Sequence, residues 1–261
     1  MQKIRTVSLY SGSSGNSTLI EYGDTKILID AGKNNKCLTN ALGRAGVGAN
    51  EINAVFVTHE HTDHISALEV FVKKVNAPVH ITSMSAYALR LPQSSALFRH
   101  LAVHSPLFEE KVGGLTVKSF GLSHDSALCV GYKITADNGY SIGIATDTGY
   151  VTEGMKQALF GCDAVILESN HDLDMLRTGP YPAELKRRIA SKFGHLSNAD
   201  CAAFAETLAE GGTKEFMLAH ISRENNTPDI ALETVGNAIK KYGATLSVAK
   251  QDAETLFCGN D

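Results

Sequence analysis

The chain has 261 residues, of which 43% are hydrophobic and 20% are charged, so it is long enough to bury a sizeable core. We expect residues 1–261 to form a single domain, because no Pro-, Gly- or Ser-rich linker divides the sequence. The formal net charge of −4 excludes a broadly basic surface of the kind on which many nucleic-acid-binding proteins depend.

Two other features of the composition concern the cellular setting. The five cysteines are odd in number, scattered and without a Cys-x-x-Cys pair, which is typical of reduced thiols. The N-terminus lacks the apolar core of a signal peptide, and no stretch is long and apolar enough to span a bilayer. We therefore expect a cytoplasmic protein without a membrane partner. A protein partner cannot be inferred from the sequence.

Apolar spacing and turn residues predict short strands and amphipathic helices in a mixed order. The predicted strands cover residues 6–10, 18–22, 26–30, 54–58, 116–120, 130–136, 141–145, 164–168, 215–219 and 246–248. The predicted helices cover residues 38–45, 65–75, 182–193, 198–210 and 228–242. Strands dominate before the first helix and alternate with helices after it. This order indicates an α+β fold with two sheets packed face to face and helices outside.

Three histidines and an aspartate lie within the run Thr58-His59-Glu60-His61-Thr62-Asp63-His64, at the end of the predicted strand 54–58. Imidazole is the commonest metal ligand, and a carboxylate supplies a charged oxygen. Alternate residues of an extended segment point the same way, so His59 and His61 would share one metal ion. Asp63 and His64 would then face a second ion. The run predicts a dinuclear hydrolase, and a solvated polar loop is the alternative interpretation.

This run resembles the His-x-His-x-Asp-His signature of the metallo-β-lactamase superfamily. The resemblance implies a four-layered αββα sandwich. It also implies that one metal ion binds His59, His61 and a later histidine, while the other binds Asp63, His64 and a final histidine. A second aspartate is expected to bridge the two ions.

Three later residues match the remaining ligand positions of that superfamily, and each follows a predicted strand. His124 matches the third ligand of the first ion, Asp147 the bridging carboxylate and His220 the last ligand of the second ion. Any one of them alone would be interpreted as a surface histidine or a turn aspartate. The ligand set mixes imidazole with carboxylate and contains no thiolate, so it suits two divalent ions, either Zn²⁺ or Mn²⁺.

Further segments resemble the YycJ/WalJ family within the superfamily. They are residues 8–17, Glu168-Ser169-Asn170-His171-Asp172, Gly194-His195-Leu196-Ser197-Asn198 and residues 220–228. The resemblance implies exonuclease action on DNA, with His195 holding the phosphate or acting as general acid and Glu168 as the acidic residue near it. The alternative interpretations are a polar residue at a helix start for His195 and a capping or ion-pairing carboxylate for Glu168.

The resulting hypothesis is a phosphodiesterase in which two ions activate a water for attack on a phosphate. Asp63 could also accept the proton of that water, so the candidate catalytic residues are Asp63, His195 and Glu168. The candidate substrate-binding residues are Ser13 and Asn16 of a Gly/Ser-rich loop, together with Arg188 and Arg223. A plain tight turn and a solvated helix face would explain the loop and the basic cluster around Arg188 equally simply.

Two segments bear on how open the site is. Residues 83–106 contain Arg90, Arg99, His100 and His104, and could form a lid or substrate wall beside the site. Only residues 169–194 separate Glu168 from His195, which leaves no room for the β-CASP cap found in the RNase J group. We expect an open groove that admits a DNA end.

Two other functions stay open. The same activated water could hydrolyse a thioester, a lactone or another carboxyl ester, and the net acidity and missing cap favour this alternative. The segments around His195 and His220 oppose it. A non-catalytic metal-binding regulatory module is a third possibility, against which the complete ligand set counts. The expected partner is a nucleic-acid substrate, preferably DNA.

Overall fold

The first of two mixed β-sheets contains the N-terminal strands and the last strand of the chain. In the computed structural model, which describes residues 4–259, its strands are β1 (Arg5–Tyr10), β2 (Ser17–Tyr22), β3 (Thr25–Ile29), β4 (Ala54–Phe56), β5 (Val79–Thr82), β6 (Leu101–His104) and β14 (Thr255–Cys258). Their order is β14-β1-β2-β3-β4-β5-β6. The pairs up to β2–β3 are antiparallel, and the pairs from β3–β4 onward are parallel.

The second sheet repeats this plan. Its strands are β7 (Glu109–Val112), β8 (Leu115–Gly121), β9 (Val130–Ala136), β10 (Ser141–Ala145), β11 (Ala164–Glu168), β12 (Glu215–Ala219) and β13 (Thr245–Val248), in the order β13-β12-β11-β10-β9-β8-β7. The strands β7 to β10 pair antiparallel, and β10 to β13 pair parallel.

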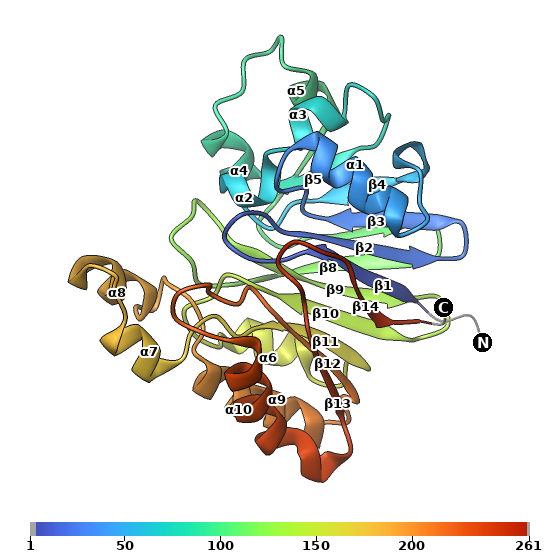
Figure 1. Cartoon of the computed structure of the whole chain (residues 1–261). Coiled ribbons are helices and arrows are strands. Elements are labelled where there is room, and N and C mark those ends of the chain that lie inside the picture. The colour runs from blue at the N-terminus through green and yellow to red at the C-terminus, as the bar shows by residue number, and fades with distance from the viewer. Residues whose placement is uncertain (1–3, 260–261) are drawn as a thin grey trace.

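Helices cover the outer faces of the two sheets. Over the first sheet lie α1 (Asn35–Arg44), α2 (Thr62–Ile65), α3 (Leu68–Phe71), α4 (Ser83–Ala88) and α5 (Ala96–His100). Beneath the second lie α6 (Glu153–Leu159), α9 (Asn198–Glu210) and α10 (Pro228–Ile239), whereas α7 (Leu173–Thr178) and α8 (Ala183–Ile189) project beyond the strand ends (Figure 1). Short 3-10 turns occur at Ala49–Glu51 and Lys240–Tyr242. The predicted α+β class and αββα sandwich are confirmed.

Three apolar clusters account for the four layers. One lies between the first sheet and its helices, one between the second sheet and its helices, and one between the two sheets. In the middle cluster the rings of Phe56 and Tyr132 meet edge to face with centroids 5.7 Å apart. The buried Tyr132 hydroxyl donates to the Val57 carbonyl at 2.6 Å, so a polar group also links the sheets.

The predicted strands were found within two residues of their expected ends. The helix predicted at residues 65–75 was wrong, because α2 and α3 take its place. Between them the Ala67 N–H donates to the Ala31 carbonyl at 2.9 Å, a tertiary bond that breaks the helical ladder. The helix predicted at residues 182–193 ends at Ile189. No helix in the described part of the chain is long and apolar enough to cross a bilayer.

Candidate metal centre

Six strands of the two sheets deliver polar side chains to one edge of the sandwich. Since β8 and β10 are both antiparallel to β9, they run in the same direction, which β11 and β12 share. The parallel strands β3 and β4 end together in the other sheet. The residues at or just after these strand ends are Asp30, His59, His124, Asp147, Glu168 and His220.

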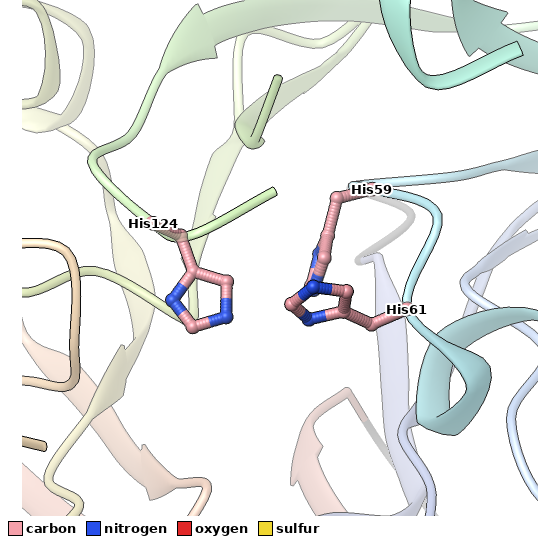
Figure 2. A group of neighbouring side chains, drawn as sticks. All are labelled: His59, His61 and His124. Carbon is pink, nitrogen blue, oxygen red and sulfur yellow. The ribbon is translucent and has the colours of Figure 1, made fainter. Parts of the chain in front are cut away.

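His59, His61 and His124 form the first group of possible ligands. Figure 2 shows His59 and His61 on one segment and His124 on a facing one, with the three rings around a common space. One nitrogen of each ring lies within 4.8 Å of the others. Nδ1 of His59 lies 3.0 Å from the Thr58 hydroxyl, and Nδ1 of His124 donates to the Gly194 carbonyl at 3.1 Å. These contacts leave the Nε2 atoms of both rings for a metal ion.

Asp63, His64 and His220 form a second group, in which one possible ligand atom of each residue lies within 4.8 Å of the others. The Nε2 atoms of His64 and His220 lie 3.3 Å and 3.8 Å from Oδ2 of Asp63. Nδ1 of His64 lies 2.7 Å from Oδ2 of the buried Asp30, so this carboxylate sets the orientation of the ring.

Asp147 lies between the two groups. Its Oδ2 is 3.3 Å from Nε2 of His64, and its Oδ1 is 3.4 Å from Nε2 of His220 and 4.0 Å from Nε2 of His124. Burial raises the pKa of this carboxyl, but the surrounding histidines outweigh burial and hold the pKa well below its ordinary value. Asp147 is thus a carboxylate that faces both groups.

Three residues of the centre have left-handed backbone conformations. The φ angles of Asp30, Asp147 and His220 are +62°, +64° and +56°, values that are uncommon outside glycine. Asp30 and His220 lie directly after a strand and Asp147 lies two residues after one, and all three side chains face the centre. Such strain persists where the surrounding structure holds it, and it is concentrated at functional sites.

The charges and unpaired atoms of the centre fit cations. Burial lowers the pKa of His220, but Asp147 and hydrogen bonds to Asp63 and Glu168 raise it to about 10, a sign of strongly negative surroundings. Among the possible ligands, three buried atoms lack any hydrogen-bond partner: His59 Nε2, Asp147 Oδ2 and His220 Nε2. Buried polar atoms are rarely left unpaired, and all three are ordinary metal ligands. The residues present therefore suit two divalent ions.

Glu168 joins the two groups to His195. This fully buried carboxylate accepts from Nδ1 of His195 at 2.8 Å and from Nδ1 of His220 at 3.0 Å. Its second oxygen accepts from the backbone N–H groups of Thr148 and Leu196. Burial raises the pKa of Glu168, but the two histidines outweigh it and lower the pKa to about 2. Glu168 therefore orients both rings as an acceptor.

A cavity of about 250 Å³ opens over the centre, and the substrate-binding candidates differ in their relation to it. Ser13 and Arg188 line it, whereas Asn16 lies behind the centre, with Nδ2 3.2 Å from Asp63 Oδ2. Arg223 lies outside it and pairs with Asp252 at 2.8 Å. No residue of 83–106 lines the cavity, so the predicted lid or wall was wrong. Those residues form α4, α5 and the edge strand β6.

Sequence reasoning missed several residues of the site. Asp30 orients His64, and Asp125 lies 3.3 Å from Nε2 of His124 while it accepts from Nε of Arg188 at 2.6 Å. Tyr181 and Asn170 line the cavity. Asp30 was detectable in principle, because it ends a predicted strand and precedes Ala31-Gly32, like the other ligand candidates. Nothing local marks Tyr181.

Replacement of Asp30 by asparagine, which tolerates the left-handed backbone of this position, should lower the affinity for the metal ions by roughly ten- to a hundredfold, because the His64 ring loses the carboxylate that orients it. Competition with a chromogenic chelator for Zn²⁺ measures this effect. Asp24→Asn, at an exposed turn position, is the matched control and should bind as the wild type does. Wild-type affinity in the Asp30 variant would show that the pair with His64 does not support the site.

Comparisons with known proteins agree with this architecture. A family model described as a beta-lactamase superfamily domain matches residues 25–221. The chain is 35% identical over 235 residues to the exodeoxyribonuclease YycJ of Bacillus anthracis, a match that covers 90% of this chain and 89% of the relative. It is 36% identical over 236 residues to the exodeoxyribonuclease WalJ of Streptococcus pneumoniae, covering 88% of this chain and 86% of the relative.

Solved structures share the fold at lower identity. The metallo-β-lactamase fold protein YhfI from Bacillus subtilis superposes with a TM-score of 0.74 at 18% identity, over 97% of this chain and all of the other. Zn²⁺-bound PqqB from Methylobacterium extorquens superposes with a TM-score of 0.70 at 16% identity, over 96% of this chain and 99% of the other. At these identities the likeness concerns the fold alone.

Proposed function

Because the chain belongs to the β-lactamase superfamily, and within it to the family of the exodeoxyribonucleases YycJ and WalJ, we propose that this metal-dependent hydrolase cleaves phosphodiester bonds at DNA ends. The observation that carries the proposal is the convergence of seven possible ligands beside the pair of His195 and Glu168. The ligands are His59, His61, His124, Asp63, His64, His220 and Asp147.

The proposed centre binds two divalent ions, either Zn²⁺ or Mn²⁺. His59, His61 and His124 would hold the first, Asp63, His64 and His220 would hold the second, and Asp147 would contribute to both. Bound there, the ions would supply a nucleophile from water at neutral pH and positive charge for the phosphoryl oxygens. Cys129 is not a candidate ligand. It is buried, and its Sγ lies 3.7 Å from Nδ1 of His59, whereas the nitrogen of that ring left for a metal ion is Nε2.

The protein's own groups move protons and hold the phosphate. Nδ1 of His195 is engaged by Glu168, so its Nε2 is the atom that can donate a proton to the leaving oxygen or to a phosphoryl oxygen. Glu168 keeps the ring in this orientation without needing to exchange protons itself. Asp63, which lines the cavity, can accept the proton of the attacking water.

A local positive charge offsets the acidic net charge at the cavity. Arg188 lines it, and Asp125 engages its Nε, which leaves the two terminal guanidinium nitrogens for a phosphate. Lys186 and Arg187 lie on the same helix, and Lys192 follows it. Of these four cations Arg188 is the one that lines the cavity, whereas the ammonium of Lys186 donates to the Arg177 carbonyl.

The competing substrate is a thioester, a lactone or another carboxyl ester. The apolar side chains of Leu185 and Ile189 in the cavity wall are the observation that favours it. Metal analysis of the purified protein, together with a panel of end-labelled DNA, RNA and chromogenic esters, separates the two. Metal-dependent release of nucleotides from DNA, with faster turnover of bis(p-nitrophenyl) phosphate than of carboxyl esters, supports the phosphodiesterase. Fast ester turnover without cleavage of any nucleic acid would reject it, and no turnover at all would favour a regulatory module.

Reversal of charge by Arg188→Glu should raise the KM for DNA on the order of tenfold or more, because a charged hydrogen bond to phosphate is lost. Activity on DNA should also fall steeply as salt rises, with a shallower slope in this variant. Lys36→Glu, an equal charge change on the exposed face of α1, is the control. Steady-state kinetics over a salt series measure both effects, and equal KM values in the two variants would contradict a role of Arg188 in binding DNA.

A further inference from the structure

One wall of the cavity is apolar and has no part in metal binding. It consists of Tyr181, just before α8, and of Leu185 and Ile189 on that helix. The two helical residues are four apart and so share one face. The metal centre and His195 line the cavity as well, so polar and apolar walls face the same space.

The apolar wall is tied directly to His195. The backbone N–H of His195 donates to the Ile189 carbonyl at 3.0 Å, so the end of α8 and the proposed acid share a hydrogen bond. Arg188 anchors the same turn of the helix to Asp125. The position of the wall relative to the reacting phosphate is therefore set by the structure of the site.

Tyr181 has the properties of a binding residue and lacks those of a core residue. Its ring is only partly buried, and its hydroxyl has no hydrogen-bond partner within residues 4–259. Tyrosines that serve packing are usually buried with the hydroxyl paired, as Tyr132 is. The ring lines the site cavity and also a neighbouring hollow of about 280 Å³.

The neighbouring hollow continues the cavity along the surface. It shares Ser13, Tyr181 and Ser222 with the cavity and reaches Arg223. A third hollow, of about 620 Å³, shares Ser222 and Arg223 and extends to Lys250. The hydroxyls of Ser13 and Ser222 follow one another along this line, while Arg223 is paired with Asp252 and Glu224 lies beside it, so the line is polar without a net positive charge.

From this arrangement we propose that Tyr181, backed by Leu185 and Ile189, stacks on the nucleobase next to the scissile phosphate, so that this base leaves the DNA stack when it is bound. The proposal rests on the nuclease function above. At about 250 Å³ the cavity is smaller than the roughly 300–1,000 Å³ of drug-sized pockets, so it accepts one small group such as a base. A paired base is already stacked inside the duplex and cannot enter such a cavity without leaving the stack.

Single-stranded oligonucleotides whose terminal residue carries a base or is abasic test the proposal. The wild type should release the base-bearing nucleotide with a KM about ten- to a hundredfold lower, the range that base–aromatic stacking supplies. Tyr181→Ala should remove this preference by raising KM for the base-bearing strand alone, whereas Tyr181→Phe should keep it because the ring remains. Tyr87→Ala, at a tyrosine that is 87% exposed on α4, should change nothing.

Two controls make the outcome decisive. Metal content and the thermal midpoint of Tyr181→Ala should match the wild type, since Tyr181 is not one of the possible ligands and is only partly buried. An oligonucleotide ending in 2-aminopurine should lose fluorescence on binding to the wild type and to Tyr181→Phe, but not to Tyr181→Ala.

The failures of the two proposals are distinguishable. Cleavage of DNA by the wild type without preference for a terminal base, or an equal loss on both substrates in Tyr181→Ala, would overturn the stacking role and leave the nuclease function standing. Absence of cleavage of any oligonucleotide would overturn both.

Discussion

Replacing Asp147 should remove both metal ions and reduce hydrolysis to background. Its two oxygens face Nε2 of His64 and of His220 at 3.3 Å and 3.4 Å, and Nε2 of His124 lies 4.0 Å away. A carboxylate shared by two ions contributes to the affinity for each of them. Without it, no anion between the two cations reduces their electrostatic repulsion. The effect should therefore exceed that of losing a ligand of a single ion.

The choice of variant matters because Asp147 has a φ angle of +64°. Alanine is strained in that conformation, whereas asparagine tolerates it, so Asp147→Asn separates loss of charge from loss of fold. Elemental analysis after dialysis against a weak chelator should find close to two ions in the wild type and close to none in Asp147→Asn. One ion at saturation in the wild type, with an unaffected site in the variant, would refute the bridging role.

The second large effect is expected at His195. His195→Ala should keep both metal ions and lower kcat by roughly a hundred- to ten-thousandfold, the range for a lost acid-base group. The ring directs Nδ1 to Glu168 at 2.8 Å, and that same nitrogen lies 3.7 Å from Asp147. Its Nε2 is consequently left for substrate, in contrast to His220, whose Nε2 faces Asp147.

Parallel measurement of metal content and of single-turnover rates checks this assignment. His171→Ala is a useful comparison, because His171 is a buried histidine near the same strand end that does not line the cavity. It should keep both ions and most of the turnover. Loss of one metal equivalent in His195→Ala would show that His195 is a metal ligand. The geometry permits this outcome, because the ligand atoms of His195, Asp147, Glu168 and His220 all lie within 4.8 Å of one another.

The fold could be predicted well where the pattern was local. The strands flanking Asp137-Asn138-Gly139 were found as β9 and β10, because a two-residue turn and alternating apolar residues specify such a hairpin within a short stretch. The strands β5, β6, β7 and β14 were missed. They are only four residues long, and all four lie at or next to a sheet edge, so their pairing partners decide their structure.

By itself, the sequence determined which side chains could form the metal centre. A histidine or carboxylate directly after an apolar strand is visible one strand at a time, and His59, His124, Asp147 and His220 share that pattern. That His124, Asp147 and His220 join the run at residues 59–64 was implied by the resemblance to the metallo-β-lactamase superfamily, since strand direction could not be predicted from the sequence.

Only the tertiary structure decided what surrounds these residues. Asp30 reaches His64 across 34 positions, and Glu168 reaches His220 across 52, by contacts that no local spacing encodes. The apolar wall over the cavity comes from α8, and not from residues 83–106, because the hydrogen bond between Ile189 and His195 directs that helix toward the site. Residue chemistry is a property of the chain, whereas which groups face one another depends on the packing of segments distant in sequence.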